Sequence, residues 1–162
     1  MNNKVGIIAG SASDLPLIKK TTETLEKLKI DYDITIASAH RTPDKVSIYA
    51  KEAENKYSVI IAAAGYAAHL GGVVSAYTNL PVIGIPINSS PLLGIDALLS
   101  TAQMPAGVPI ATVSIGEAGA VNSAVLAARI ISLFNSDVKE ALNKYKQDMV
   151  DKIEKADADL QR

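Results

Sequence analysis

The sequence contains no cysteine, no tryptophan and a single phenylalanine. The absence of cysteine excludes disulfide frameworks, thiolate nucleophiles and cysteine-based zinc or iron–sulfur sites. Because 6 tyrosines are the only other large aromatic residues, rings cannot fill much of the interior. We therefore expect close packing of backbones, with small residues at any subunit interface.

The sequence also lacks an excess of charge of either sign. It has 16 lysines and arginines and 17 aspartates and glutamates, which gives a net charge of −1. This balance gives no global field to attract nucleic acid or an anionic membrane, so we expect no nucleic-acid partner and no membrane partner. No secretory signal precedes the first apolar run, and no run approaches the ~20 residues of a membrane helix, which predicts a cytoplasmic protein.

What the sequence does contain is enough apolar material for one core. Hydrophobic residues make up 48% of the 162 positions and charged residues 20%. The length fits one domain of roughly 150 residues. Since no internal repeat or linker interrupts the chain, we expect residues 1–162 to form a single domain.

Short apolar runs alternate with amphipathic stretches along the chain. The runs predict strands at residues 5–9, 32–37, 59–64, 81–87 and 110–115. The stretches predict helices at residues 15–28, 43–55, 95–102 and 118–134, with a short helix opened by the glycine-bounded segment 65–72. Apolar strands that alternate with helices are typical of a parallel sheet covered on both faces. The sequence thus predicts a three-layer α/β fold of the flavodoxin-like or Rossmann-like kind.

The last stretch, residues 137–160, is charged but carries a narrow apolar stripe. The stripe residues recur at alternating three- and four-residue steps, as on one side of a long helix: Leu142, Tyr145, Met149, Ile153, Ala156 and Leu160. Such a stripe needs a surface to lie on. The helix predicted at 118–134 is apolar almost all round, which indicates that another subunit covers its outer side.

In parallel sheets of this kind, ligands bind beyond the carboxyl ends of the strands. After the first strand, Gly10 lets the backbone turn closely, and Ser11 and Ser13 offer hydroxyls and amides at a helix start, which suits a phosphate. Asp14 adds a carboxylate that can accept hydrogen bonds from ribose hydroxyls. Ser13 or Asp14 is equally typical of a helix cap, and capping is compatible with ligand binding.

Ser38, His40 and Arg41 follow the second strand, ahead of a Thr42-Pro43 helix start. Imidazole titrates near neutrality, so His40 is the best general acid/base candidate in the chain. Arg41 suits bidentate binding of a phosphate. A lone loop histidine is most often a solvated surface residue, but the flanking serine and arginine favour the catalytic interpretation.

The segment after the third strand surrounds His69 with small residues, which let a ligand approach backbone amides. Taken alone, His69 is more typical of a buried, hydrogen-bonded structural histidine. The chain has no H-x-H or H-E-x-x-H metal spacing, no dinucleotide or triphosphate glycine motif and no G-x-S-x-G elbow. We therefore expect acid/base chemistry on a small phosphorylated substrate, with no metal and no cofactor.

Five sequence strings together resemble one family. They are GSASD at 10–14, SAHRTPD at 38–44, AAHL at 67–70, and LPVIGIPI at 80–87 followed by GIDALLSTAQMPAGVPIAT at 94–112. These long, ordered strings closely resemble the N5-carboxyaminoimidazole ribonucleotide mutase (PurE) family of purine biosynthesis, over nearly the whole chain. The resemblance implies a flavodoxin-like homo-octamer that isomerises N5-carboxyaminoimidazole ribonucleotide to 4-carboxyaminoimidazole ribonucleotide without a metal or organic cofactor. It also implies that the C-terminal helix lies on neighbouring subunits.

By matching position, the resemblance implies a role for each candidate residue. Ser11 and Asp14 would hold the ribose phosphate end, Arg41 would bind the phosphate, and His40 would be the acid/base residue. The substrate-binding set would further include Ser13, and the imidazole and carboxylate side would be lined by Ser38, Ala64, Gly65, His69 and Leu70.

Two positions depart from the family's usual GGAAHLPG loop: Tyr66 replaces the second glycine and Gly71 the proline. A related branch, which carboxylates aminoimidazole ribonucleotide directly with CO2, carries arginine at the Tyr66 position and lacks the histidine. Because this chain keeps His69 and the HRTP string, we expect the mutase. The direct carboxylase and a non-catalytic nucleotide-binding module are the alternatives.

Overall fold

The computed structural model describes residues 3–161. Its centre is a five-stranded sheet in which every neighbouring pair is parallel, with the order β2-β1-β3-β4-β5. The strands are β1 (Lys4–Ala9), β2 (Asp31–Ile36), β3 (Val59–Gly65), β4 (Val82–Ile87) and β5 (Ala111–Thr112). The predicted α/β class and parallel sheet are confirmed.

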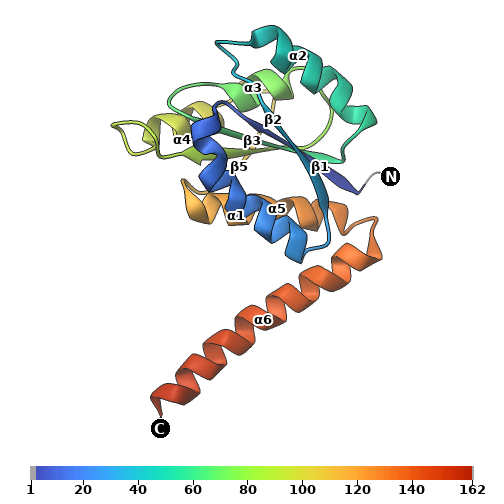
Figure 1. Cartoon of the computed structure of the whole chain (residues 1–162), viewed down its shortest axis with the longest axis vertical. Helices are drawn as coiled ribbons and strands as arrows, with labels where there is room; N and C mark the ends of the chain where they lie inside the picture. The colour runs from blue at the N-terminus through green and yellow to red at the C-terminus, as the bar shows by residue number, and fades with distance from the viewer. Residues whose placement is uncertain (1–2, 162) are drawn as a thin grey trace.

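Helices cover both faces of the sheet (Figure 1). One face carries α1 (Leu15–Lys27) and α5 (Glu117–Ile131). The other face carries α2 (Pro43–Glu52), α3 (Leu70–Ser75) and α4 (Ile95–Ala102), and two short 3₁₀ turns are η1 (Ala12–Asp14) and η2 (Ala53–Asn55). The helix predicted at 43–55 therefore divides into α2 and η2, and α5 ends three residues before the predicted limit of 134.

The fifth strand is shorter than predicted. Residues 110–115 form a strand only at Ala111–Thr112, which pairs with Ile83 and Gly84. Beyond it the chain still follows β4 through two separate hydrogen bonds, from Val113 N to Gly84 O (3.1 Å) and from Gly116 N to Pro86 O (3.0 Å). The bonds no longer form a regular ladder there, because the chain turns toward α5 at Gly116, which has a φ of 73°.

The core follows from the alternation of side chains along each strand. In β1, Val5 and Ile7 face the α1/α5 layer, whereas Ile8 faces the opposite layer, and all three are fully buried. Each such side chain contributes roughly 1.5–3 kcal/mol through burial. Buried alanines on α5 let α1 approach closely, and Thr21 on α1 donates a hydrogen bond to the Ala120 carbonyl (2.9 Å).

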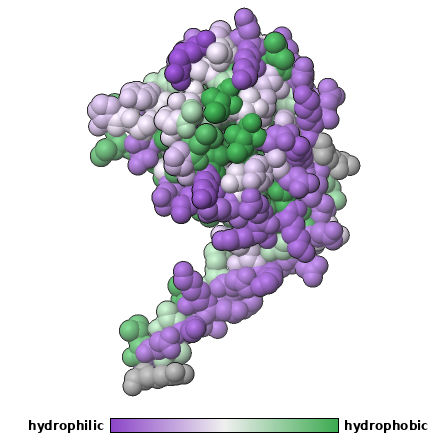
Figure 2. Space-filling view, in the orientation of Figure 1, coloured by the Kyte–Doolittle hydropathy of each residue, from purple (hydrophilic) through white to green (hydrophobic). Residues whose placement is uncertain are grey.

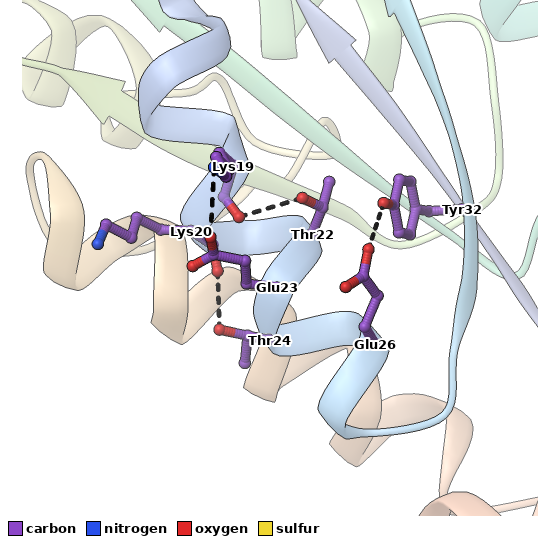
Figure 3. A network of polar contacts seen from close by, with 7 residues as sticks. All are labelled: Lys19, Lys20, Thr22, Glu23, Thr24, Glu26 and Tyr32. Atoms are coloured by element: carbon purple, nitrogen blue, oxygen red, sulfur yellow. Dashed lines mark hydrogen bonds and ion pairs between the residues drawn. The ribbon is translucent and has the colours of Figure 1, made fainter.

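Polar contacts within α1 and from α1 to β2 add to the packing of this helix (Figure 3). Thr22 and Thr24 donate their hydroxyl protons to the Lys19 and Lys20 carbonyls at 3.1 and 2.8 Å. The Tyr32 hydroxyl on β2 donates to the Glu26 carboxylate at 2.7 Å. This last bond joins the edge strand β2 to the end of α1.

The long helix α6 (Ser136–Leu160) confirms the helix predicted at 137–160 and projects away from the sheet (Figure 1). Asn135 caps it by accepting a hydrogen bond from Val138 N (3.0 Å). Val138 and Leu142 are buried and the partly buried Tyr145 packs against the same core, so the first three turns rest on this chain's own core. No helix among residues 3–161 is long and apolar enough to cross a membrane.

Candidate active site

The candidate residues from three loops meet around one cleft of about 730 Å³ at the carboxyl ends of β1, β2 and β3. The cleft is lined by Gly10, Ser11, Ser13, Asp14, Ser38, His40, Arg41, Ala64, Gly65, Tyr66, Ala68 and Ser89. Eight of the ten predicted site residues are in this set. The convergence follows from the parallel sheet, which places the ends of neighbouring strands at one edge.

A larger cleft of about 850 Å³ lies at the opposite end of the sheet, beside the start of β4. Among the described residues its lining has one cation, Lys51, and no histidine, carboxylate or arginine. The groups suited to proton transfer and phosphate binding therefore lie in the cleft at the carboxyl ends.

The loop after β1 builds the first wall. The Ser11 hydroxyl oxygen accepts hydrogen bonds from Ser13 N (3.3 Å) and from the Ser13 hydroxyl (2.9 Å), so Ser11 caps η1. Asp14 stands at the N-cap position of α1, but its side chain makes no capping bond, so the prediction that the Ser13 or Asp14 side chain caps this helix is wrong. Ser11 caps η1, the turn ahead of α1, because its extended backbone aims its side chain at that turn.

Asp14 is a buried carboxylate that makes no capping bond to α1. Burial raises the pKa of its carboxyl group above the ordinary value of 3.8, and hydrogen bonds from Ser11 and Ser13 and the charge of Arg41 oppose that rise. A cleft-facing carboxyl group whose pKa is raised by burial, with nearby hydrogen bonds and charge opposing the rise only in part, is typical of a functional site. Asp14 can accept hydrogen bonds from a ligand without giving up a structural one.

The loop after β2 joins the second wall to the first. The Arg41 guanidinium donates a hydrogen bond from Nη2 to the Gly10 carbonyl at 2.9 Å. Arginine has five N–H donors, so this bond fixes the group and leaves others for a phosphate. The Ser38 hydroxyl accepts a bond from Arg41 N (3.2 Å), and His40 is exposed on the cleft wall.

Thr42 stands at the predicted helix start, but its side chain does not cap α2. Its hydroxyl oxygen instead accepts a bond from Ser38 N (2.9 Å) and donates to Ser38 O (3.2 Å). These reciprocal bonds close the loop that presents His40 and Arg41. Side-chain closure of this kind competes with capping because both use the same hydroxyl.

The loop after β3 builds the third wall. A Cβ atom at Gly65 would overlap the Ser89 hydroxyl, so the loop after β4 packs directly on the end of β3. Tyr66 and His69 both have left-handed backbones, with φ values of 56° and 46°. This loop changes direction twice in four residues before α3 begins.

The structure does not bring His69 and Leu70 side chains into the cleft lining. His69 is exposed at the start of α3, so the interpretation of it as a buried structural histidine is wrong. The Leu70 side chain is buried in the core, in the same cluster as Ala62 and Val74.

Gly10, Tyr66, Ala68 and Ser89 also line the cleft but were not among the predicted site residues. Ser89 follows β4, and the rule that finds sites beyond strand ends points to it once β4 is known to adjoin β3. The sequence alone does not show the order in which the strands pair, so it does not point to Ser89. Within residues 3–161, no three His, Asp or Glu side chains gather closely enough to hold a metal ion.

Comparison with known proteins identifies close relatives. The family model described as AIR carboxylase matches residues 4–152. The chain is 52% identical over 147 residues to a Pyrococcus abyssi protein named N5-carboxyaminoimidazole ribonucleotide mutase, covering 90% of this chain and 83% of that protein. A Bacillus subtilis protein of the same name is 50% identical over 148 residues, 91% of each chain. The crystal structure of a Treponema denticola PurE2 variant superposes with a TM-score of 0.90 at 32% identity, covering 100% of both chains.

Proposed function

Because the chain belongs to the AIR carboxylase family, we propose that it converts N5-carboxyaminoimidazole ribonucleotide into 4-carboxyaminoimidazole ribonucleotide in purine biosynthesis. The observation that carries this proposal is the shared cleft of His40 and Arg41, a proton carrier and a fixed cation, in a chain about half identical to proteins of that name. The reaction is an isomerisation, so no net oxidation or hydrolysis is required.

The proposed binding mode uses the first two walls of the cleft. Arg41 is held by Gly10 with further N–H donors remaining, and it binds the 5′-phosphate together with the Ser11 and Ser13 hydroxyls. The buried Asp14 carboxylate accepts hydrogen bonds from the ribose hydroxyls. This arrangement leaves the aminoimidazole ring to extend toward Ser38, His40 and the end of β3.

The proposed chemistry has two steps. The bond between N5 and its carboxylate breaks, CO2 is released inside the cleft, and N5 takes up a proton. Ring carbon C4 then attacks the CO2, and His40 removes the C4 proton to restore the aromatic ring. One proton is delivered and one is removed, so a single imidazole can carry both transfers.

The third wall encloses the reacting end of the substrate. Ala64 and Gly65 present a small, close surface because no side chain fits at Gly65. We propose that His69 turns toward the imidazole and carboxylate side when the ligand is bound, and that Leu70 contributes its backbone there. Exclusion of water from this wall favours capture of CO2 over its escape.

We further propose that the chain forms a homo-octamer in the cytoplasm, in which residues 1–162 form one domain and α6 lies on neighbouring subunits. Beyond its first turns α6 carries apolar side chains that this chain's own described residues do not cover, including Met149 (49% exposed) and Ile153 (70% exposed). Figure 2 shows hydrophobic surface at the lower end of α6 amid hydrophilic surface. A second copy of the chain provides a surface for this stripe.

The rival activity is direct carboxylation of aminoimidazole ribonucleotide, which the bulky Tyr66 side chain on the third wall favours. A paired assay separates the two. The protein receives either N5-carboxyaminoimidazole ribonucleotide or aminoimidazole ribonucleotide with bicarbonate, and the 4-carboxylated product is followed. The mutase is expected to turn over the first substrate. Turnover of the second alone would establish the carboxylase, and turnover of neither would leave a binding module.

A further inference from the structure

Tyr66 is the largest ring in the cleft. Among the described residues that line the cleft, the only rings are those of Tyr66 and His40, and the others are small or polar. The Tyr66 side chain is 56% exposed, so a ligand can still cover much of it. It stands on the third wall, next to Gly65, where the proposed substrate places its heterocycle.

The backbone of Tyr66 is unusual for a tyrosine. Its φ of 56° lies in the left-handed region, which costs an L-residue energy that glycine is spared. Lys29 has a similar φ of 58°, but it follows α1, where Ile30 N bonds back to Leu25 O (3.0 Å) and closes the helix end. Tyr66 follows a strand, so helix termination does not account for its conformation. Strain of this kind is typical of functional sites.

The substrate of the proposed reaction offers a flat aromatic ring. The polar groups after β1 and β2 match its phosphate and ribose, and none of them provides an apolar face for the heterocycle. We propose that the Tyr66 ring lies against the aminoimidazole ring and shields C4 and the released CO2 from water. This inference rests on the proposed function.

The consequence for the reaction concerns the CO2 between the two steps. Once the N5–carboxyl bond breaks, the cleft holds aminoimidazole ribonucleotide and CO2, and C4 must attack before the CO2 diffuses away. A ring over the heterocycle closes one exit and keeps the two reactants in contact. Replacement of Tyr66 by a small residue opens that exit and removes the stacking surface.

The test uses substrate labelled with ¹³C in the N5-carboxylate, in excess unlabelled bicarbonate, and measures the share of label retained in the product. Calorimetry measures the Kd of aminoimidazole ribonucleotide in parallel. Tyr66→Gly is expected to lower label retention and to weaken binding about 5- to 100-fold, the range of one lost aromatic stack. It should also raise Tm by roughly 2–4 °C, because glycine relieves the backbone.

The control is Lys29→Gly, at a left-handed residue that does not line the cleft. It should raise Tm to a similar extent and leave label retention and Kd at the wild-type values. Tyr66→Phe restores a ring and is expected to lie closer to wild type than to Tyr66→Gly. Should Tyr66→Gly fail to fold, Tyr66→Leu replaces it, with weaker binding of the ligand again expected.

The outcomes separate the two proposals. Wild-type protein that makes no 4-carboxylated product contradicts the proposed function, and wild-type product that carries no label contradicts the shielding of CO2. Wild-type protein that retains label, with Tyr66→Gly or Tyr66→Leu unchanged in both retention and Kd, overturns the role of Tyr66 and leaves the function standing.

Discussion

At the scale of single residues, unfavourable conformations and environments are concentrated around the cleft. Asp14 is a buried carboxylate with no capping bond, and Tyr66 and His69 hold left-handed backbones. Leu93, in the neighbouring loop after β4, is left-handed as well. Folded proteins keep such features where function needs them, so the cleft is distinguished by its energetics as well as by its residue types.

His40 and Arg41 are adjacent in the chain but have different proposed roles, which substitution separates. His40→Asn removes the proton carrier and is expected to lower kcat by at least about 10²-fold with ligand binding retained. Arg41→Ala removes the phosphate contact and is expected mainly to raise KM. Steady-state kinetics and calorimetry on both variants measure the contrast. Wild-type kcat in His40→Asn would remove His40 from the mechanism.

The buried carboxyl group of Asp14 gives stability a defined pH dependence. Its pKa is raised above 3.8 in the folded protein, so folding favours the protonated form. The stability that this group contributes is therefore full below pH 3.8 and is lost as the pH rises through the folded-state pKa. Asp14→Asn abolishes the titration, and its Tm relative to wild type should be more favourable at about pH 7 than at about pH 3.

Asp44→Asn is the matched control, because Asp44 is an exposed carboxylate in the first turn of α2. Thermal unfolding across the pH range compares the two variants. A difference in Tm between Asp14→Asn and wild type that stays constant with pH would contradict a raised pKa for Asp14 in the folded protein. The Asn variant should also bind the nucleotide more weakly, since its neutral amide offers one acceptor oxygen to the ribose hydroxyls in place of two charged ones.

At the scale of elements, the sequence predicts the strands and helices well because their periodicity is local. The buried run of β4 and the helical spacing of α6 each appear within their own residues. The length of β5 is not local, because it depends on where its neighbour β4 continues to pair. The caps are ambiguous for a different reason, since Ser11, Ser13 and Thr42 each have several possible partners within a few residues.

The contact between the end of β3 and the loop after β4 is a second feature that sequence alone does not show. Gly65→Ala would drive its methyl group into the Ser89 hydroxyl. Overpacking of this kind typically costs about 1–3 kcal/mol, which should appear as a lower Tm. Adding Ser89→Ala removes the hydroxyl and is expected to recover part of the loss.

Thermal unfolding of the two single variants and the double variant forms a double-mutant cycle. If the effects of the two substitutions on stability simply add, the end of β3 and the loop after β4 do not press on each other. A favourable coupling between the substitutions would locate the strain at this contact, which sets the depth of the third wall.

At the scale of the whole molecule, α6 is the element that the rest of the chain does not explain. Val138, Leu142 and the partly buried Tyr145 attach it to this chain's core, and its remaining turns project away from the sheet (Figure 1). The sequence predicts both the helix and its unpartnered stripe from spacing. It cannot show which surface receives the stripe, because a subunit interface depends on a second chain's geometry as well as on this one.

Charges on the stripe should therefore disrupt the assembly. Met149→Glu with Ile153→Glu places two carboxylates among side chains that we propose to be covered by another subunit, and the particle mass measured by light scattering should fall. Gln147→Glu with Ala158→Glu puts the same charge change on the opposite side of α6 and should preserve the mass. Equal masses for both double variants would contradict docking through the stripe.

The most direct test of the account is a crystal structure of the protein with aminoimidazole ribonucleotide bound. We expect the phosphate within hydrogen-bonding distance of Arg41, about 3 Å, and ring carbon C4 about 3–3.5 Å from an imidazole nitrogen of His40. A nucleotide bound at another site, with neither side chain in contact, would contradict the claim that this cleft performs the reaction.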